Sequence, residues 1–178
     1  MFAPAGKGFT LVELLFTLAV AGVLCVLAVP SFARLGARTR LDNVDNGMVA
    51  ALHFARASAI QGGSAVLLCP SRDGRACSGA SDWSIGWLVA ADRNHDGVPD
   101  GRPLRRGAAL GHGLRAVSSS GRRRVRYVAD GSAPGSNLSI VVCQAGQADS
   151  ARKIVVANSG RVRQGTPTDR QAAACAAG

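Results

Sequence analysis

An apolar run near the N-terminus most constrains how this chain can fold. The 21 residues from Phe9 to Val29 contain a single formally charged side chain, Glu13. As an α-helix with about 1.5 Å of rise per residue, the run would extend about 31 Å, close to the roughly 30 Å of a bilayer core. The run therefore predicts a membrane-spanning helix, and a plain membrane anchor is the simplest interpretation of it.

Glu13 argues for something more specialised than a plain anchor. A carboxylate inside a bilayer is costly, so an ionisable residue there is a candidate functional residue. Its burial becomes tolerable when a cation meets it in low-dielectric surroundings. We therefore expect Glu13 to have a positively charged partner in the assembled protein.

The segment from Lys7 to Leu14, KGFTLVEL, resembles the N-terminus of type IV pilins and of type II secretion pseudopilins. The resemblance implies that residues 1–8 are a leader, that a prepilin peptidase cleaves between Gly8 and Phe9, and that Phe9 is then methylated. It also implies that Glu13 pairs with the N-terminal amine of a neighbouring pilin subunit. Because the apolar run follows the cleavage site, it stays in the mature chain, unlike that of an ordinary secretory signal.

The resemblance also implies a location. The protein would cross the bacterial inner membrane once, with its head in the periplasm, and would reach the cell surface in a pilus after assembly. Positive charges flank the run on both sides, so counting them does not support a cytoplasmic N-terminus. The leader motif and the cysteines of the head favour that orientation.

The next segment reads as an amphipathic helix. Pro30 is expected to kink or break the helix, which resumes to Gln61 and stops at Gly62-Gly63. Apolar residues recur there every three or four positions: Leu41, Val44, Met48, Leu52, Ala55 and Ala59. Charged residues fall largely on other faces: Arg38, Asp42, Asp45, His53 and Arg56.

After Gly63 the pattern changes to short strands separated by Gly- and Ser-rich turns. The expected strands are 65–69, 83–91, 125–129, 138–143, 153–157 and 161–163. The sequence thus predicts an α+β protein of the type IV pilin fold. Its long N-terminal helix would have a transmembrane half (9–29) and an amphipathic half (30–61), packed on an antiparallel β head (62–178).

Five cysteines are present, and Cys25 lies inside the apolar run. The other four, Cys69, Cys77, Cys143 and Cys175, suggest two disulfides in an oxidising compartment, with three possible connectivities. We favour Cys69–Cys77, which closes a short loop, and Cys143–Cys175, which tethers the C-terminal tail. A zinc site is the rival interpretation, but the spacings lack close CxxC pairs.

Charge is concentrated in the second half of the chain. The net charge is +10, and residues 101–178 carry 13 basic and 3 acidic side chains. A basic half-domain points to a polyanionic partner, although any one arginine cluster could simply be a solvated loop. We expect no enzyme and no cofactor, because the three histidines sit in no catalytic motif and no phosphate-binding Gly-rich loop with Lys is present.

Residues 92–100 resemble the first nine positions of a calcium loop, with Asp92, Asn94, Asp96 and Asp100 at the ligand spacing. Pro103 stands where the bidentate Glu is expected. A tight Asx-type turn explains the same residues equally well. We therefore predict no metal site, with calcium as the open alternative.

The head resembles the FimT-type minor pilins and the GspH-type pseudopilins. The resemblance is carried by residues 52–60, by Gly86-Trp87-Leu88-Val89, by residues 92–97 and by the segment from Ser159 to Arg163. In the FimT branch, a GRxR motif near the C-terminus resembles the DNA-contacting element of competence pilins. It implies that the head binds double-stranded DNA for uptake in natural transformation. The alternative is a structural pseudopilin that primes a secretion pseudopilus and binds no nucleic acid.

The expected DNA-binding residues follow from this motif. If 153–157 is a strand and residues 158–160 a turn, then Arg161 and Arg163 point to one face, about 6.5–7 Å apart, close to the phosphate spacing of a DNA strand. The predicted group is Arg161, Arg163, Lys153, Arg152 and Gly160, and secondary candidates are Arg122, Arg123, Arg124 and Arg126.

Overall fold

The computed structural model describes Gly8 and residues 10–177, apart from the side chains of residues 27–31, 33 and 34. The chain forms two compact units, Met1–Thr39 and Arg40–Gly178. The predicted amphipathic half of the long helix, from Arg40 onward, thus belongs to the same unit as the β head. The head is therefore larger than its β-rich part alone.

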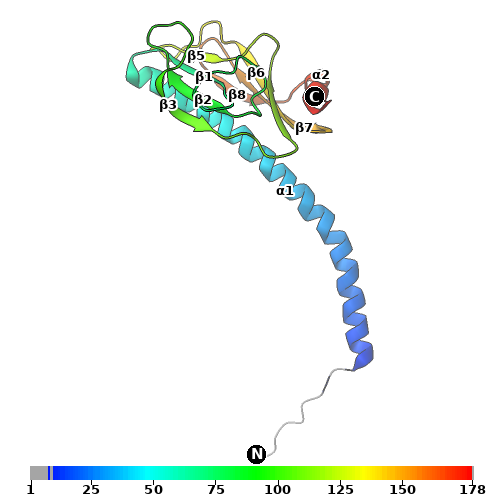
Figure 1. Cartoon of the computed structure of the whole chain (residues 1–178). Coiled ribbons are helices and arrows are strands. Elements are labelled where there is room, and N and C mark those ends of the chain that lie inside the picture. Colours follow the sequence, from blue (N-terminus) through cyan, green and yellow to red (C-terminus); the bar gives the residue numbers. More distant parts are fainter. Residues whose placement is uncertain (1–7, 9, 178) are drawn as a thin grey trace, which may run out of the picture. The chain divides into compact units, whose positions relative to one another are not determined.

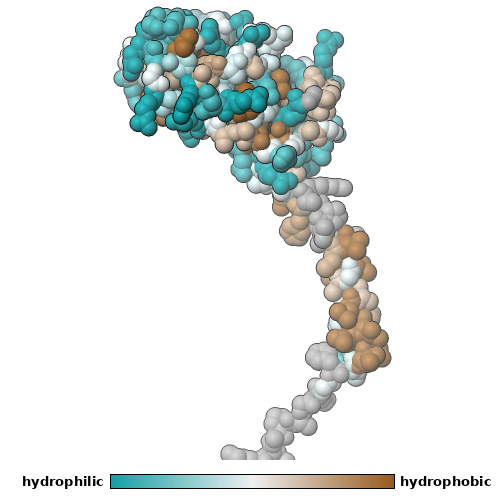
Figure 2. Space-filling view, viewed as in Figure 1, coloured by the Kyte–Doolittle hydropathy of each residue, from teal (hydrophilic) through white to brown (hydrophobic). Residues whose placement is uncertain are grey.

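The helix α1 extends over Leu11–Gly62 without interruption (Figure 1). Of the kink or break predicted at Pro30, the break does not occur. A proline removes one backbone donor, and the helix-forming residues on either side keep the backbone helical. The side chains from Leu11 to Val26 are exposed, and Figure 2 shows the apolar surface that they give this part of the helix. Within the described residues, no helix is both long enough and apolar enough to cross a membrane.

The second half of α1 packs into the head through the predicted apolar face. Leu41, Met48, Leu52, Ala55 and Ala59 are buried, and Val44 is half-buried. Gly63, with φ of 58°, stops the helix as predicted.

Asp45 differs from the prediction for the polar face of the helix, because it is buried, with 5% of its surface exposed. It lies at the border of the apolar face, where it accepts a 2.5 Å hydrogen bond from Nε2 of Gln164. The helical spacing alone gave no sign of this buried partner.

The head contains two four-stranded sheets in which every strand pair is antiparallel. The first has the order β3-β2-β1-β5, and its strands are β1 (Val66–Pro70), β2 (Trp87–Ala91), β3 (Asp100–Gly107) and β5 (Val125–Tyr127). The second has the order β4-β6-β7-β8, and its strands are β4 (Leu114–Ser118), β6 (Leu138–Gln144), β7 (Gln147–Val156) and β8 (Val162–Gly165). The helix α2 (Asp169–Ala177) packs against β6 and β7 (Figure 1).

Three elements were not predicted: β3, β4 and α2. The strand β3 contains glycine, proline and three arginines, which an edge strand tolerates because one side of its backbone needs no partner. The strand predicted over 83–91 is also too long. Only Trp87–Ala91 joins a sheet, while Trp83 is buried in the main core ahead of a turn at Gly86.

The main core lies between α1 and the inner faces of both sheets. Leu52 of α1, Val89 of β2, Ile140 of β6 and Ile154 of β7 belong to one buried cluster. Two disulfides join Cys69 to Cys77 and Cys143 to Cys175, which is the connectivity favoured from the sequence. Cys25 is free and exposed.

Candidate nucleic-acid interface

The predicted DNA-binding motif lies in the hairpin formed by β7 and β8. Val155 pairs with Arg163 and Val156 with Val162, and the N–H of Ala157 donates to the carbonyl of Arg161 at 3.0 Å. Side chains alternate between the two faces of a strand, so alternate residues of the hairpin face opposite sides of the sheet. The predicted residues can therefore be sorted by face.

The inner face of the hairpin is tied to α1. Ile154, Val156 and Val162 pack in the main core, and Gln164 bonds to Asp45. Arg152 is on this face too, where its Nη2 lies 3.4 Å from the Asp42 carboxylate. The structure therefore separates Arg152 from the other predicted arginines. Both partners of this ion pair are about half-exposed, so the pair contributes at most about 1 kcal/mol.

The outer face of the hairpin carries Lys153, Arg161 and Arg163, which we call the hairpin triad. Arg161 and Arg163 are exposed, and Lys153 is half-buried. In the described part of the chain, no carboxylate oxygen lies within 4.0 Å of any of the three. Arg163 lies on the edge strand β8, and Arg161 directly precedes this strand, which begins one residue later than the predicted strand 161–163.

Gly160 is buried and shapes the turn. Its φ is 76°, and a Cβ atom built there would lie 1.9 Å from the carbonyl oxygen of Gly131. The N–H of Ala133 also donates to the carbonyl of Asn158 at 2.8 Å, which holds the turn against the 131–133 segment. Gly160 thus positions the hairpin, and the surface that a ligand could touch belongs to its neighbours.

The helix α2 restrains the chain beyond β8. Cys175 is bonded to Cys143 of β6, and Ala172 packs with Ala151 and Val141 on the outer face of the sheet. Thr168 and Gln171 exchange hydrogen bonds of 3.3 and 3.0 Å, which form a capping box at the start of α2. The C-terminal tail is therefore an ordered helix.

Arg170 is a basic residue of this face that the sequence reasoning missed. It is exposed and lines a hollow with Ser139 and Val141, whose ladder partners in β7 are Val155 and Lys153. The capping box at Thr168 would have indicated a helix there and placed Arg170 in its first turn. It extends the basic surface of the hairpin triad towards β6.

The secondary candidates lie elsewhere: Arg122, Arg123 and Arg124 on the segment that leads into β5, and Arg126 on β5 itself. Nη1 of Arg122 donates to the carbonyl of Gly135 at 2.7 Å, and Nη1 of Arg124 donates to that of Gly97 at 2.8 Å. Arg123 is exposed and Arg126 is half-buried. These four residues form a group separate from the hairpin triad.

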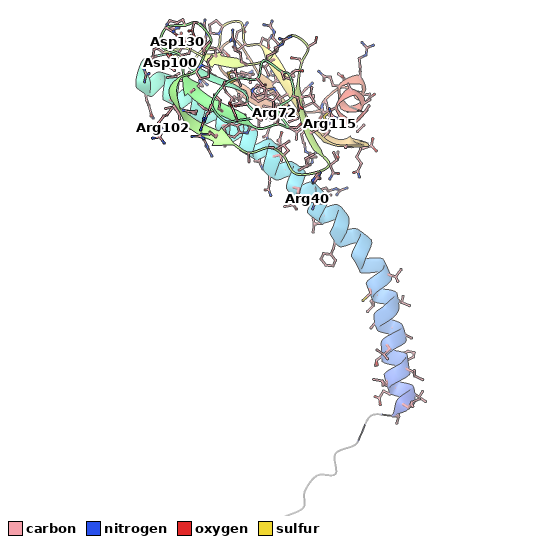
Figure 3. The ribbon with its side chains drawn as sticks, in the orientation of Figure 1. Arg40, Arg72, Asp100, Arg102, Arg115 and Asp130 are labelled. Carbon is pink, nitrogen blue, oxygen red and sulfur yellow. A yellow bond between two sulfur atoms is a disulfide. The ribbon has the colours of Figure 1, made fainter. Side chains whose placement is uncertain are left out.

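Other arginines are distributed over the head. Figure 3 labels Arg72 on the loop after β1, Arg102 on β3 and Arg115 on β4. The arginines of the head are therefore carried by several different segments. The hairpin triad and the group at residues 122–126 are distinct places at which positive charge gathers.

Burial and hydrogen bonds shift three pKa values near these groups. Burial raises the pKa of Asp45 above its usual value and that of Tyr127 to about 12. Hydrogen bonds from the side chain and backbone of Ser132 lower the pKa of Asp130, which lies in the segment next to the hairpin turn. Asp130 therefore stays ionised at neutral pH.

The loop at residues 92–100 uses its side chains for internal hydrogen bonds. Asp96 accepts from the N–H of Val98 at 2.7 Å, Asp100 from that of Arg93 at 2.6 Å, and Asp92 from that of Gly97 at 3.2 Å. This is the Asx-type turn that was weighed against a calcium loop. Within the described residues, no group of three or more His, Cys, Asp or Glu side chains is placed to hold a metal ion.

Of the N-terminal motif, Gly8 and Glu13 are described and both are exposed. The N–H of Glu13 donates to Oγ1 of Thr10 at 3.2 Å, so Thr10 caps the start of α1. The leader residues 1–7 and Phe9 lie outside the described residues, and so does the predicted cleavage junction.

Solved structures share this fold. The type IV minor pilin FimU of Pseudomonas aeruginosa is 21% identical, with a TM-score of 0.60 over 75% of this chain and 92% of FimU. The minor pseudopilin EpsH from the type II secretion system of Vibrio cholerae is 13% identical, with a TM-score of 0.52 over 72% of this chain and 98% of EpsH. No curated protein matches the sequence. The chain has the type IV pilin fold.

Two family profiles match the sequence itself. The prokaryotic N-terminal methylation motif covers residues 5–29, and the family described as type II transport protein GspH covers residues 46–160. The family implies a protein that is anchored in a membrane and then assembled with other pilin subunits, after processing by a prepilin peptidase. The chain therefore belongs to the GspH family and is a minor pilin or pseudopilin of the type IV pilus or type II secretion kind.

Proposed function

We propose that this chain is a minor pilin of a type IV pilus whose head binds double-stranded DNA without sequence preference, for DNA uptake in natural transformation and for pilus assembly. The observation that carries the proposal is the hairpin triad. Arg161 and Arg163 are exposed on one face of the hairpin, at the start of the edge strand β8, with no carboxylate within 4.0 Å among the described residues. The inner face of the same hairpin is bonded to α1, whereas Arg161 and Arg163 are exposed on the outer face, beside the part that α2 covers.

The chemistry of the triad favours contacts to phosphate. Arginine binds phosphate through two parallel N–H donors, whereas reading bases requires side chains that reach into a groove. Binding through phosphates is sequence-independent and weakens steeply with salt, with dissociation constants of roughly 10⁻⁴–10⁻⁶ M at physiological salt. The Cys143–Cys175 bridge and the fixed turn reduce the entropy that the hairpin would lose on binding.

The N-terminal segment serves assembly in this proposal. A prepilin peptidase cleaves between Gly8 and Phe9, and residues 9–29 anchor the mature chain in the bacterial inner membrane, with the head in the periplasm. On assembly, Glu13 pairs with the methylated amine of a neighbouring subunit. The profile match to the methylation motif over residues 5–29 supports the processing step.

Replacing the two exposed arginines tests DNA binding. Binding of a fluorescent DNA duplex to the processed full-length protein in non-ionic detergent would be measured by anisotropy over a range of salt. Loss of two phosphate contacts in Arg161→Gln/Arg163→Gln should weaken binding at least about tenfold and reduce the salt slope by about 2. The control Arg102→Gln removes an exposed arginine of β3 and should have a much smaller effect.

A second candidate function is a structural minor pseudopilin of a type II secretion system that binds no nucleic acid. The match to the GspH profile and the fold shared with EpsH favour it. Failure of the wild-type protein to bind duplex at low salt would leave this function as the better one. Equal loss in Arg102→Gln and in the double variant would instead move the DNA contacts away from the hairpin.

A further inference from the structure

A cavity of about 580 Å³ opens on the head where three segments meet. They are the loop at the Cys69–Cys77 disulfide, up to Gly79, the 92–100 loop, and the segment that leads into β5; Gly135 completes the lining. Each is held in place, the first by its disulfide and the other two by hydrogen bonds. The volume falls in the range of roughly 300–1,000 Å³ that is common for small-ligand sites.

The lining of this cavity is strongly basic. Arg122, Arg123 and Arg124 line it, and no acidic residue is among the lining residues that the structure describes. None of the three has a carboxylate oxygen within 4.0 Å in the described part of the chain. Asp96 lines an adjacent, smaller hollow, and its oxygens already accept from Val98 and Asn94. The arginines of the larger cavity therefore form no ion pair of 4.0 Å or less among the described residues.

Two of these arginines are fixed by backbone contacts that leave most of their donors free. Arg122 gives one hydrogen bond to Gly135 and Arg124 gives one to Gly97, whereas a guanidinium has five N–H donors. Arg124 reaches Gly97 because this position lacks a side chain: a Cβ atom there would lie 2.4 Å from Nη1 of Arg124. The guanidinium groups are thus held in position by neutral partners.

We propose that this cavity is a binding site for a small phosphate-bearing anion, separate from the hairpin triad. Arginine forks match the oxygens of phosphate, and charge-assisted hydrogen bonds of this kind are stronger than those between neutral groups. The concave shape suits a small anion, whereas a duplex would contact only the rim. The phosphate can belong to a free anion or to a lipid headgroup.

Calorimetric titration of sodium pyrophosphate into the full-length protein in non-ionic detergent, at about 0.15 M salt so that distant surface charges are screened, tests the site. Wild-type protein should bind, and Arg123→Gln should weaken binding about tenfold because one charged fork is lost. Arg123 makes no side-chain hydrogen bond within the described residues, so the substitution should leave the fold intact. Arg123→Lys keeps the positive charge but lacks the paired N–H donors of arginine. Its affinity for pyrophosphate should therefore lie between those of the wild type and Arg123→Gln.

Two control variants separate this site from general attraction to a basic protein. Arg72→Gln removes an exposed arginine of the neighbouring disulfide loop that does not line the cavity, and Arg161→Gln/Arg163→Gln removes the hairpin arginines. Both should keep pyrophosphate affinity within about twofold, the scale of a change in screened surface charge. Equal losses in Arg123→Gln and Arg72→Gln would overturn the proposal, as would absence of binding to the wild type. If Arg161→Gln/Arg163→Gln loses binding to the DNA duplex but keeps its affinity for pyrophosphate, the result bears only on the function proposed for the hairpin triad.

A second titration distinguishes a free phosphate anion from the phosphate of a lipid headgroup. Mixed micelles of the detergent with phosphatidic acid present the same group on a lipid. Tighter binding to these micelles than to pyrophosphate, lost in Arg123→Gln, would identify a lipid headgroup as the ligand. Equal or weaker binding, with the same dependence on Arg123, would identify a free anion.

Discussion

Gly160 is held by two constraints that act on one backbone position. Its positive φ disfavours any side chain, and the carbonyl of Gly131 occupies the space where a Cβ atom would lie. Gly165, five residues further on, has neither constraint, because a Cβ atom there would meet nothing within 4 Å. The two glycines of the hairpin therefore differ in what they contribute to stability.

Substitution of each by alanine should show this difference. Gly160→Ala is expected to lower the free energy of unfolding by roughly 2–3 kcal/mol, because the turn must shift away from Gly131. Gly165→Ala should change it by less than about 0.5 kcal/mol. Urea unfolding followed by circular dichroism measures both, and equal effects would show that the turn is not tightly packed.

The buried carboxyl of Asp45 should make the stability of the head depend on pH. Because burial raises its folded-state pKa above 3.8, the folded protein binds this proton more tightly than the unfolded chain does. The carboxyl therefore favours folding fully below pH 3.8, and this contribution is lost as pH rises through the folded-state pKa. Asp45→Asn should remove that dependence.

The measurement is the melting temperature of Asp45→Asn minus that of the wild type, taken from pH 3.5 to pH 7. This difference should grow as the pH rises through the window above 3.8. Asp149→Asn is the control, because Asp149 is exposed and forms no ion pair among the described residues. A constant difference for Asp45→Asn would mean that Gln164 compensates fully for the burial of the carboxylate.

The elements that the sequence predicted correctly are those whose pattern repeats along the chain. The apolar spacing from Leu41 to Ala59 and the β-branched residues of β6 and β7 reflect burial in the main core. The strand β3 escaped prediction because its place is set by pairing with β2, and its own side chains are mostly exposed. Alternation along a strand places the adjacent Arg152 and Lys153 on opposite faces, but which of them shares a face with Arg163 is set by the register of β7 and β8, and local spacing does not contain that information.

The two disulfides differ in the length of chain that they close. Cys143–Cys175 spans 32 positions and Cys69–Cys77 spans 8. In the chain-entropy description, the longer loop contributes about 3.7 kcal/mol and the shorter about 2.5 kcal/mol. We therefore expect Cys143→Ala/Cys175→Ala to lose more stability than Cys69→Ala/Cys77→Ala in denaturant titrations of the full chain. The reverse order would indicate that packing around the 69–77 loop outweighs chain entropy.

At the scale of the whole molecule, processing and assembly depend on the N-terminal segment. The proposal requires a mature chain that begins with methylated Phe9, which mass spectrometry of the purified protein would detect. A mature chain with another N-terminus would exclude cleavage after Gly8. Gly8 and Phe9 lie near the start of the segment, residues 5–29, that matches the methylation motif.

Glu13→Ala separates processing from assembly. The variant should be cleaved normally, because the junction is intact, but should enter filaments poorly because the neighbouring amine loses its carboxylate partner. Immunoblots of sheared filaments against whole cells measure the assembled fraction, with Glu13→Asp as the charge-retaining control. Equal incorporation of Glu13→Ala and wild type would remove this role from Glu13.

The closed loop between Cys143 and Cys175 also bears on how the head would respond to mechanical load. A ligand attached at Arg163 and pulled away from α1 would load the ladder between β7 and β8, starting from the edge strand. Arg163 lies inside the covalent loop, so tension reaches β6 along the chain in both directions. One route runs back through β7, and the shorter one runs forward through α2 and the disulfide. The distance over which β8 can separate from β7 is therefore limited by the length of that shorter route. The head would stay bound to its ligand at forces that would detach a strand with a free end.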